Sequence, residues 1–396
     1  MSAGRLVILG ASGFVGTTLA ERMRVRPGWD VVPVIHSAGS AWRLARHGRP
    51  LLQVDIGDRA ALRAALQGAT HVVNCTRGGA DVMIDGLKNM LAECQAAGVK
   101  KFVHLSSVMV YGDPPAPASE HEDGPVDDKQ SIETYGGMKL EQDRMVERAA
   151  SQGLASVVLC PPNISGPYSL YLCGIIDALR KRSFALLDDG ATPCNVVDVR
   201  TLCAAIEAGL TADLSIADGK RMFVTDGEAV TWRSVVDELQ GLAEVDEVRR
   251  VARELLAARV RQQQAVPAAS VSRTLKHLVS SDVRTALRKD PLLARIDRVA
   301  RAGVARMGSN IEGRVRRGIE GVTPIPRIDP LAGLQIGLCA QQLRGVTHRD
   351  DRVRKALGYE PPIGFRTSMA DFRRWYASFF GTGSREWALA RHLSVG

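Results

Sequence analysis

The stretch Arg5-Leu-Val-Ile-Leu-Gly10-Ala-Ser-Gly13-Phe-Val-Gly16, near the start of the chain, predicts how the first part of the protein folds. Its apolar half is typical of a buried strand, and an amphipathic helix begins after Gly13. Gly10 permits a tight turn, Gly13 lets backbone amides approach an anion, and Gly16 lets helix and strand pack closely. A strand, a glycine turn and a helix in this order predict a cradle for the phosphates of a dinucleotide.

Short apolar runs alternate with amphipathic stretches as far as residue 162. Strands are expected at residues 6–9, 31–35, 51–54, 71–75, 102–105 and 156–159. Helices are expected at residues 14–24, 59–66, 81–97 and 134–152. Apolar strands separated by helices imply a parallel sheet covered on both faces, so the predicted fold is a doubly wound α/β (Rossmann) fold.

The rhythm becomes irregular after Pro161, which predicts a second part of the chain. A helix is expected near residues 199–210 and a strand near 221–225. Residues 1–162 are predicted to form the dinucleotide-binding Rossmann domain, and residues 163–240 with 322–396 a smaller substrate-binding lobe. The Ala/Arg/Leu/Val-rich residues 241–321 are predicted to form a basic helical insertion.

The net charge of +9 is concentrated in residues 249–317, which hold 17 Lys and Arg against 5 Asp and Glu. This segment has no interleaved aromatic residues and no nucleic-acid motif, so a solvated basic face is expected rather than a nucleic-acid site. Its apolar positions recur at helical spacing, which favours packing on the protein. A peripheral contact with an anionic membrane surface stays open.

The seven cysteines are scattered and form neither a CxxC pair nor a Cys/His cluster. They are expected to be small buried hydrophobic residues in a reducing compartment, and no metal site is predicted. No leader-like segment and no apolar run of about 18 residues occurs, so a cytoplasmic location is expected.

The end of the second strand reads Val34-Ile35-His36-Ser37 and has no carboxylate for the adenosine ribose hydroxyls. His36, Ser37, Arg43 and Arg46 could instead receive a 2′-phosphate, so NADP is slightly favoured over NAD. The alternative is that both arginines are solvated helix residues.

The third strand ends at Asp55 and Ile56, which are expected to contact the adenine amino group and the adenine ring. Asp58, which stands two residues further on, is a candidate N-cap of the next helix.

Tyr135 and Lys139 stand at positions i and i+4, so they share one face of a predicted helix. A neighbouring ammonium and the charge of the nicotinamide are expected to favour the phenolate and to lower the pKa of the tyrosine toward neutrality. Ser107, at the carboxyl end of the fifth strand, is expected to place its hydroxyl beside Tyr135. Together the three groups would polarise a carbonyl or take the proton of an alcohol during hydride transfer.

The GxxGxxG turn, the Ser-Ser-x-x-Val-Tyr-Gly stretch at residues 106–112 and the YxxxK pair resemble the extended short-chain dehydrogenase/reductase family of NAD-dependent epimerases and dehydratases. The resemblance covers residues 5–240, with a weaker match at 352–361. It implies the catalytic set Ser107, Tyr135 and Lys139. It implies substrate contacts at Ser107, Met109, Asn163 and Asn195. Motifs and resemblance together assign cofactor contacts to Gly10, Ser12, Gly13, Phe14, Val15, Gly16, His36, Asp55, Ile56, Asn74, Cys75, Thr76, Tyr135, Lys139 and Pro162.

The sequence departs from this family at several positions near the expected site. Cys160 and Ser165 replace an arginine and a tyrosine, and Met83 replaces an asparagine. The fourth strand ends in Asn74-Cys75-Thr76-Arg77-Gly78, where the family has a pair of small residues. Substrate contacts are therefore expected to differ from the usual ones, although the reacting groups are intact.

Sugar dehydratases and decarboxylases of this family carry an acidic residue directly after the catalytic hydroxyl, whereas this chain has Val108 and Met109. This leaves an NAD(P)-dependent epimerase or reductase of a nucleotide sugar. A dehydrogenase or reductase of a sterol-like or other hydrophobic alcohol is the first alternative. A non-catalytic cofactor-binding sensor or scaffold is the second. Family resemblance also suggests a homodimer formed through the helices at Asp81 and Thr134.

Overall fold

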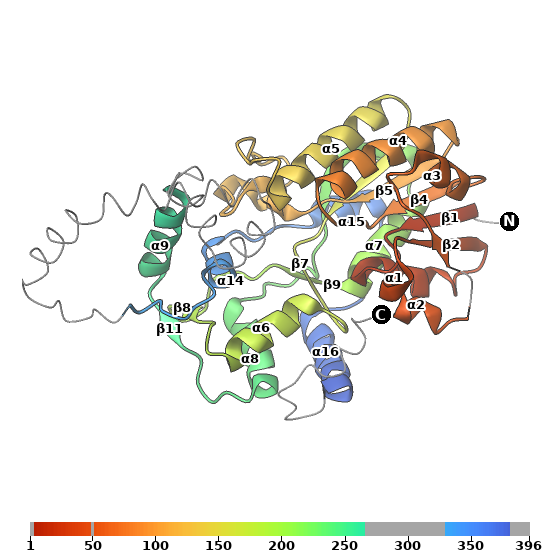
Figure 1. Ribbon diagram of the computed structural model, residues 1–396. Helices are drawn as coiled ribbons and strands as arrows, with labels where there is room; N and C mark the ends of the chain where they lie inside the picture. Colours follow the sequence, from red (N-terminus) through yellow and green to blue (C-terminus); the bar gives the residue numbers. More distant parts are fainter. Residues whose placement is uncertain (1–3, 49–50, 266–328, 381–396) are drawn as a thin grey trace, which may run out of the picture. The chain divides into compact units, whose positions relative to one another are not determined.

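The computed structural model describes residues 4–48, 51–265 and 329–380 of the chain (Figure 1). The chain divides into two compact units, Met1–Ala252 with Gly337–Gly396, and Arg253–Ile336.

The second unit contains part of the predicted basic insertion. Its described residues include helix α9 (Arg253–Ala265), and Arg259 Nη2 donates a hydrogen bond to Asp329 Oδ2 at 2.7 Å. Residues 266–328, which carry most of the predicted insertion, lie outside the described residues. No described helix has both the length and the apolar character that a membrane crossing requires.

The first unit is built on a seven-stranded sheet with the strand order β10-β6-β5-β4-β1-β2-β3, and every pairing in it is parallel. Its strands are β1 (Gly4–Leu9), β2 (Trp29–Ile35), β3 (Leu52–Gln53), β4 (His71–Asn74), β5 (Lys101–Leu105), β6 (Ser156–Cys160) and β10 (Asp218–Phe223). Two short parallel pairs accompany the sheet, β7 (Asn163–Ser165) with β9 (Val196–Asp198) and β8 (Leu186–Leu187) with β11 (Arg250–Val251). The predicted doubly wound α/β fold is confirmed.

Helices cover both faces of the sheet (Figure 1). The helices of the first unit are α1 (Phe14–Met23), α2 (Trp42–Ala45), α3 (Arg59–Ala65), α4 (Leu87–Ala96), α5 (Tyr135–Ser151), α6 (Leu170–Arg180), α7 (Val199–Thr211), α8 (Trp232–Ala243), α15 (Asp351–Leu357) and α16 (Phe365–Phe380). Because successive strand residues point to opposite faces, Val7 and Leu9 pack with α3, α4 and α5, while Leu6 and Ile8 pack with α1 and α7. Helix α14 (Ile336–Ala340) begins at the boundary between the units.

The helix expected at 81–97 begins with a π-helical stretch, Asp81–Gly86, before α4. At Gly86 a Cβ atom would lie 2.4 Å from Ile56 Cδ1, so the backbone packs directly on this side chain where the helix changes its winding. The third strand is shorter than expected. The strand expected near 221–225 instead spans Asp218–Phe223.

The turn after β1 requires glycine at two positions. Gly10 has φ +76°, and a Cβ atom there would lie 2.8 Å from the carbonyl carbon of Cys75. A Cβ atom on Gly16 would lie 2.3 Å from the carbonyl oxygen of Gly10. All of these neighbouring atoms are backbone atoms. A side chain at Gly16 would therefore push α1 away from the turn after β1, and one at Gly10 would push this turn away from the backbone that follows β4.

We expect Gly16→Ala to lower the free energy of unfolding by about 2 kcal/mol, because the methyl group collides with backbone that cannot rotate away. Gly174→Ala is the matched control, since Gly174 lies in α6 and a Cβ atom added there would meet no atom within 4 Å. This change should leave stability unchanged or raise it by about 0.5 kcal/mol. Urea unfolding of both variants measures the difference, and equal stabilities would show that the close approach is not required.

Candidate active site

Tyr135, Lys139 and Ser107 lie together where β5 and α5 meet. Thr134 caps α5 by accepting a hydrogen bond from Gly137 N at 3.1 Å, so Tyr135 is the first helical residue and Lys139 lies one turn later. The Ser107 hydroxyl lies close enough to the phenol of Tyr135 to lower its pKa. Lys139 Nζ donates to the carbonyl oxygen of Leu105, the last residue of β5, at 2.7 Å. The structure therefore brings the three predicted catalytic residues together.

Burial governs the protonation of both titratable groups. Lys139 is 4% exposed, and desolvation lowers the pKa of its ammonium, opposed chiefly by the charge of Asp143. Desolvation also raises the pKa of the Tyr135 phenol, opposed first by the charge of Arg77 and next by the hydrogen bond from Ser107. Among the protein's own groups, burial outweighs the favourable charges, and the leading favourable charge belongs to Arg77 and not, as expected, to Lys139.

Arg77 is a site residue that the motifs do not reveal. It lies after β4, its side chain is exposed, and its guanidinium carbon lies 5.0 Å from the centroid of the Tyr135 ring. The signal in the sequence is a charged residue at a strand end where the resembling family has small residues.

Asp143 stands one helical turn beyond Lys139 and is 2% exposed. It accepts a hydrogen bond from Ser106 Oγ at 2.8 Å and lies 3.4 Å from Arg221 Nη1 on β10. His104 Nε2 on β5 lies 3.9 Å from its second carboxylate oxygen. Desolvation raises the pKa of Asp143, and the hydrogen bond from Ser106 and the charges of Arg221 and Lys139 oppose this effect.

His104 connects Asp143 to the end of β4. Asn74 Nδ2 lies 3.2 Å from His104 Nδ1, so this ring nitrogen is the acceptor and His104 Nε2 carries the hydrogen that faces Asp143. Burial lowers the pKa of His104 well below its ordinary value, which keeps the ring neutral. Asn74 Oδ1 in turn accepts hydrogen bonds from Thr76 N at 3.0 Å and Thr76 Oγ1 at 2.7 Å.

A pocket of about 450 Å³ opens beside this buried network and is lined by both Asp143 and Arg221. Its other walls include exposed charged residues, among them Glu147 and Lys220. The polar groups beneath Tyr135 and Lys139 therefore extend to a water-accessible surface near α5 and β10.

The turn Gly10–Gly16 fits the diphosphate of a dinucleotide. Helix α1 begins after Gly13 with no side-chain cap and no acidic residue in its first turn, so its first N–H groups are available to an anion. A Cβ atom on Gly13 would lie 3.3 Å from Gly10 O, and the lack of a side chain there leaves room for a ligand close to the backbone. Ser12, Phe14 and Val15 lie in the same turn and the first helical turn, as the motif predicts.

The other predicted cofactor contacts lie at the carboxyl ends of neighbouring strands. Asn74 is the last residue of β4, Cys75 and Thr76 follow it, and Pro162 comes after β6. Asp55 Oδ1 accepts a hydrogen bond from Gly57 N at 2.8 Å, which fixes the turn after β3, while Asp58 caps α3.

The end of β2 differs from the expected arrangement. His36 and Ser37 are exposed. Arg43 and Arg46 both form ion pairs with Glu21 on α1, at 2.7 and 2.6 Å, and the Arg43 guanidinium also lies 3.9 Å from the centroid of the Tyr168 ring. One carboxylate therefore already holds both arginines.

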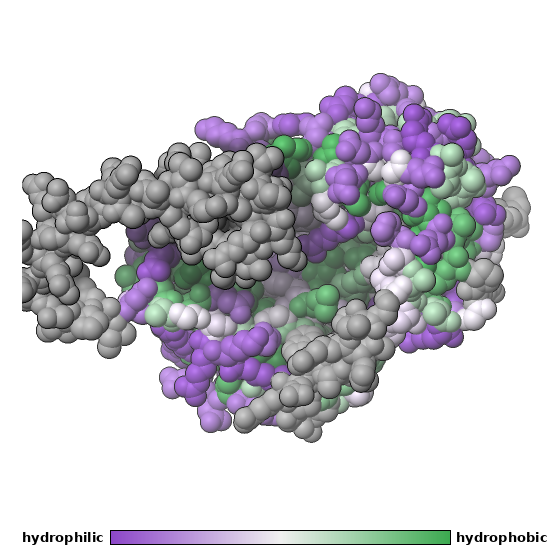
Figure 2. Space-filling view, in the orientation of Figure 1, coloured by the Kyte–Doolittle hydropathy of each residue, from purple (hydrophilic) through white to green (hydrophobic). Residues whose placement is uncertain are grey.

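The predicted substrate residues lie in separate environments. Met109 is in a 3-10 turn, Val108–Tyr111, and Asn163 opens β7. The side-chain amide of Asn195 donates to Val346 O at 2.7 Å and accepts from His348 N at 3.0 Å, so it fastens the segment before α15. Figure 2 shows hydrophobic side chains gathered in a hollow over β7 and β9.

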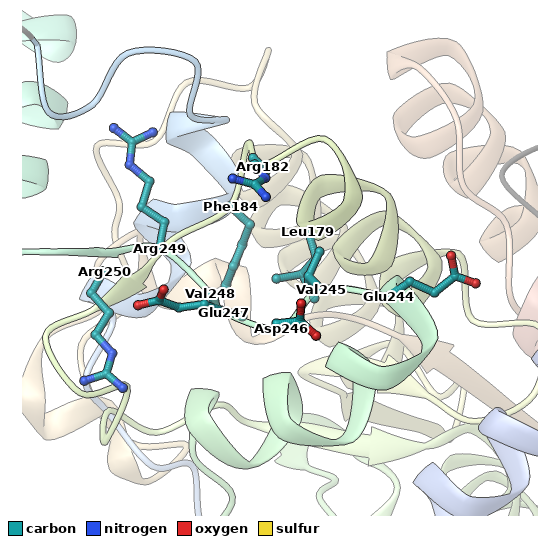
Figure 3. A pocket seen from close by; sticks show the side chains of 10 residues that line it. All are labelled: Leu179, Arg182, Phe184, Glu244, Val245, Asp246, Glu247, Val248, Arg249 and Arg250. Atoms are coloured by element: carbon teal, nitrogen blue, oxygen red, sulfur yellow. The ribbon is translucent and has the colours of Figure 1, made fainter. Parts of the chain in front are cut away.

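A second cavity, of about 980 Å³, lies near β11 and the loop after α8 (Figure 3). Its charged lining residues balance, with the arginines Arg182, Arg249 and Arg250 and the carboxylates Glu244, Asp246 and Glu247. None of the residues predicted for catalysis, cofactor or substrate lines it.

The glycine turn after β1 and the parallel, helix-covered sheet are the features of a dinucleotide-binding α/β protein. The chain belongs to the NAD-dependent epimerase/dehydratase family, whose model matches residues 6–222.

Two curated relatives are similar to parts of the chain. Quinone oxidoreductase 2 of Escherichia coli (strain K12) is 30% identical over 29% of this chain and 41% of its own length. UDP-glucose 4-epimerase of Streptomyces lividans is 26% identical over 41% of this chain and 53% of its own length. The chain therefore spans about half the length of the relatives it matches, or less.

Solved structures share the fold. UDP-glucose 4-epimerase of Thermotoga maritima with UDP-glucose has a TM-score of 0.61 at 15% identity and covers 94% of this chain and 99% of its own. dTDP-glucose 4,6-dehydratase of Bacillus anthracis in complex with NAD has a TM-score of 0.62 at 13% identity, with 95% and 97% coverage.

We predict that Asp143→Asn moves the alkaline limb of the activity profile to lower pH by about one unit. The carboxylate raises the lowered pKa of Lys139, so its loss makes the ammonium deprotonate at lower pH. Glu147→Gln is the matched control, since Glu147 lines the same pocket but is exposed. Rates of hydride transfer between about pH 6 and 10 test this, and a uniform loss at every pH would mean that Asp143 serves folding alone.

Proposed function

We propose that this enzyme moves a hydride and a proton on a nucleotide sugar, either as an epimerase that passes through a ketone or as a reductase. The observation that carries this proposal is the grouping of Ser107, Tyr135 and Lys139 at the end of β5, on the sheet edge that also carries the glycine turn after β1. Ligands of doubly wound sheets bind at this edge, so the glycine turn and the Ser107, Tyr135 and Lys139 group can contact the same ligand.

Each residue has a defined task in the proposed reaction. Tyr135 exchanges a proton with the substrate oxygen, and Ser107 donates a hydrogen bond to the same oxygen. Lys139, anchored to Leu105, supplies positive charge beside them and would hold the nicotinamide ribose. A bound nicotinamide dinucleotide would supply the hydride acceptor or donor.

The residues next to the catalytic hydroxyl favour epimerisation or reduction over elimination. Val108 and Met109 form the 3-10 turn after Ser107 and offer no carboxylate or other acid. The two curated relatives support the same pair of reactions, since one is named an epimerase and the other an oxidoreductase. A sterol-like or other hydrophobic ketone is the alternative substrate, and the apolar hollow over β7 and β9 favours it (Figure 2).

We expect Tyr135→Phe to lower the rate of hydride transfer by at least about 10³-fold, because the phenol is the group proposed to exchange the proton with the substrate oxygen. Dinucleotide affinity should change by less than about threefold, since the ring is retained. Stopped-flow absorbance of the reduced cofactor gives the rate, and titration of cofactor fluorescence gives the affinity. A variant that keeps its rate would remove Tyr135 from the chemistry and favour a sensor or scaffold role.

The cofactor preference depends on the charges at the end of β2. The absence of a carboxylate at this strand end slightly favours NADP. However, Arg43 and Arg46 already form ion pairs with Glu21. The preference for NADP therefore depends on His36 and Ser37, unless a 2′-phosphate competes with Glu21 for the arginines.

We predict that Glu21→Gln raises the affinity for NADP relative to NAD by about fivefold, or about 1 kcal/mol, because it frees both guanidinium groups. Glu207→Gln is the matched control, since Glu207 on α7 pairs with Arg22 and Arg26, two arginines at the C-terminal end of α1 that are not predicted to contact the cofactor. Calorimetric titration with both dinucleotides measures the ratio. An unchanged ratio would place Arg43 and Arg46 outside the cofactor site.

We further propose that the protein forms a homodimer and is located in the cytoplasm. We propose no nucleic-acid partner, and a peripheral membrane contact is an alternative role for the basic segment. The seven cysteines are free thiols, which suits a reducing compartment. The outer surfaces of α4 and α5, the helices suggested for the dimer, are mostly hydrophilic (Figure 2).

A further inference from the structure

Arg77 lies at the reacting edge of the sheet, in the short loop between β4 and the π-helical stretch. It comes three residues after the end of β4 at Asn74, and its guanidinium carbon stands 5.0 Å from the centroid of the Tyr135 ring. The side chain is exposed, so an arriving ligand can reach it. A cation over the face of an aromatic ring is a weak contact at an exposed site, so this contact leaves the guanidinium available to a stronger partner.

Within the described part of the chain, Arg77 has no carboxylate at ion-pair distance, unlike other arginines that pair with acids. Arg43 and Arg59, for example, are held by Glu21 and Glu93. A guanidinium presents parallel N–H groups that match the two oxygens of a carboxylate. Arg77 therefore offers two parallel N–H groups next to the phenol of Tyr135.

We propose that Arg77 is a specificity-determining residue that binds a carboxylate of the substrate next to the carbon that reacts at Tyr135. This inference rests on the proposed function, because it requires the phenol to contact the reacting oxygen. An anion bound to a guanidinium that stands 5.0 Å from that ring lies close to the reacting carbon. A carboxylate on the neighbouring carbon of a sugar meets this condition, whereas the diphosphate of a nucleotide sugar is attached at the anomeric carbon.

The electrostatics of the site support a substrate with negative charge. Arg77 opposes the rise in the pKa of Tyr135, and it further lowers the pKa of Lys139. A carboxylate bound to Arg77 would offset the second effect and help Lys139 to keep its charge. An anionic substrate would thus balance the site, in which two positive groups, Arg77 and Lys139, stand against one carboxylate, Asp143.

The first test compares turnover of UDP-glucuronate and UDP-glucose by the wild-type holoenzyme, Arg77→Gln and Arg77→Lys. Arg77→Gln should lower kcat/KM for UDP-glucuronate by about 10- to 100-fold and for UDP-glucose by less than about threefold. Arg77→Lys keeps the charge but lacks the paired N–H groups, so its kcat/KM for UDP-glucuronate should lie between those of the wild type and of Arg77→Gln. Arg148→Gln, at an exposed position of α5 that pairs with Glu141, is the control. Equal losses on both substrates would overturn the inference and point to the shared diphosphate.

The second test needs no turnover. D-glucuronate is titrated into the holoenzyme with reduced cofactor, and quenching of cofactor fluorescence is followed, with glucose as the neutral probe. We expect saturable binding of glucuronate that is at least about tenfold weaker in Arg77→Gln. Equal binding by both proteins, or none, overturns the role of Arg77. Arg77-dependent binding without turnover of either nucleotide sugar would instead reject the proposed function and leave the carboxylate site standing.

Discussion

The arrangement of the site depends on burying the ammonium of Lys139. A buried charge is tolerated only when polar groups and opposite charge surround it. Leu105 O at the end of β5 accepts its hydrogen bond, and Asp143 provides the negative charge one turn away on α5. This fixes α5 against β5, which in turn sets Tyr135 beside Ser107. The carbonyl group of Leu105 and the carboxylate of Asp143 therefore hold the reacting groups in place.

Much of the fold could be predicted from the sequence. The glycine turn at Gly10–Gly16 and the apolar runs of the parallel strands depend on local backbone and burial requirements, which are visible in the order of the residues. The same holds for the Tyr135 and Lys139 pair, since a helix alone brings i and i+4 together. Asp58 as the cap of α3 is likewise a local feature, because its carboxylate binds amides two and three residues later.

Contacts between distant segments could not be predicted in this way. The ion pairs of Glu21 with Arg43 and Arg46 join α1 to residues after β2. Asn195 forms hydrogen bonds with residues 346 and 348. Arg77 is visible in the sequence only as a departure from a family pattern, and its place over Tyr135 depends on how β4 and α5 meet. The effects of burial and of Arg77 on the pKa of Tyr135 could not be predicted, because they depend on the assembled site.

The most direct test of the central claim is mass spectrometry of the small molecules released when the purified protein is denatured after incubation with NAD and NADP and removal of unbound cofactor. We predict about one dinucleotide per chain, lost in a Gly13 variant with a bulky side chain. NAD retained from expression would point to an epimerase, and reversible uptake of NADPH to a reductase. A chain that neither retains nor takes up a dinucleotide would contradict the claim that the glycine turn and the Tyr135 site serve one cofactor.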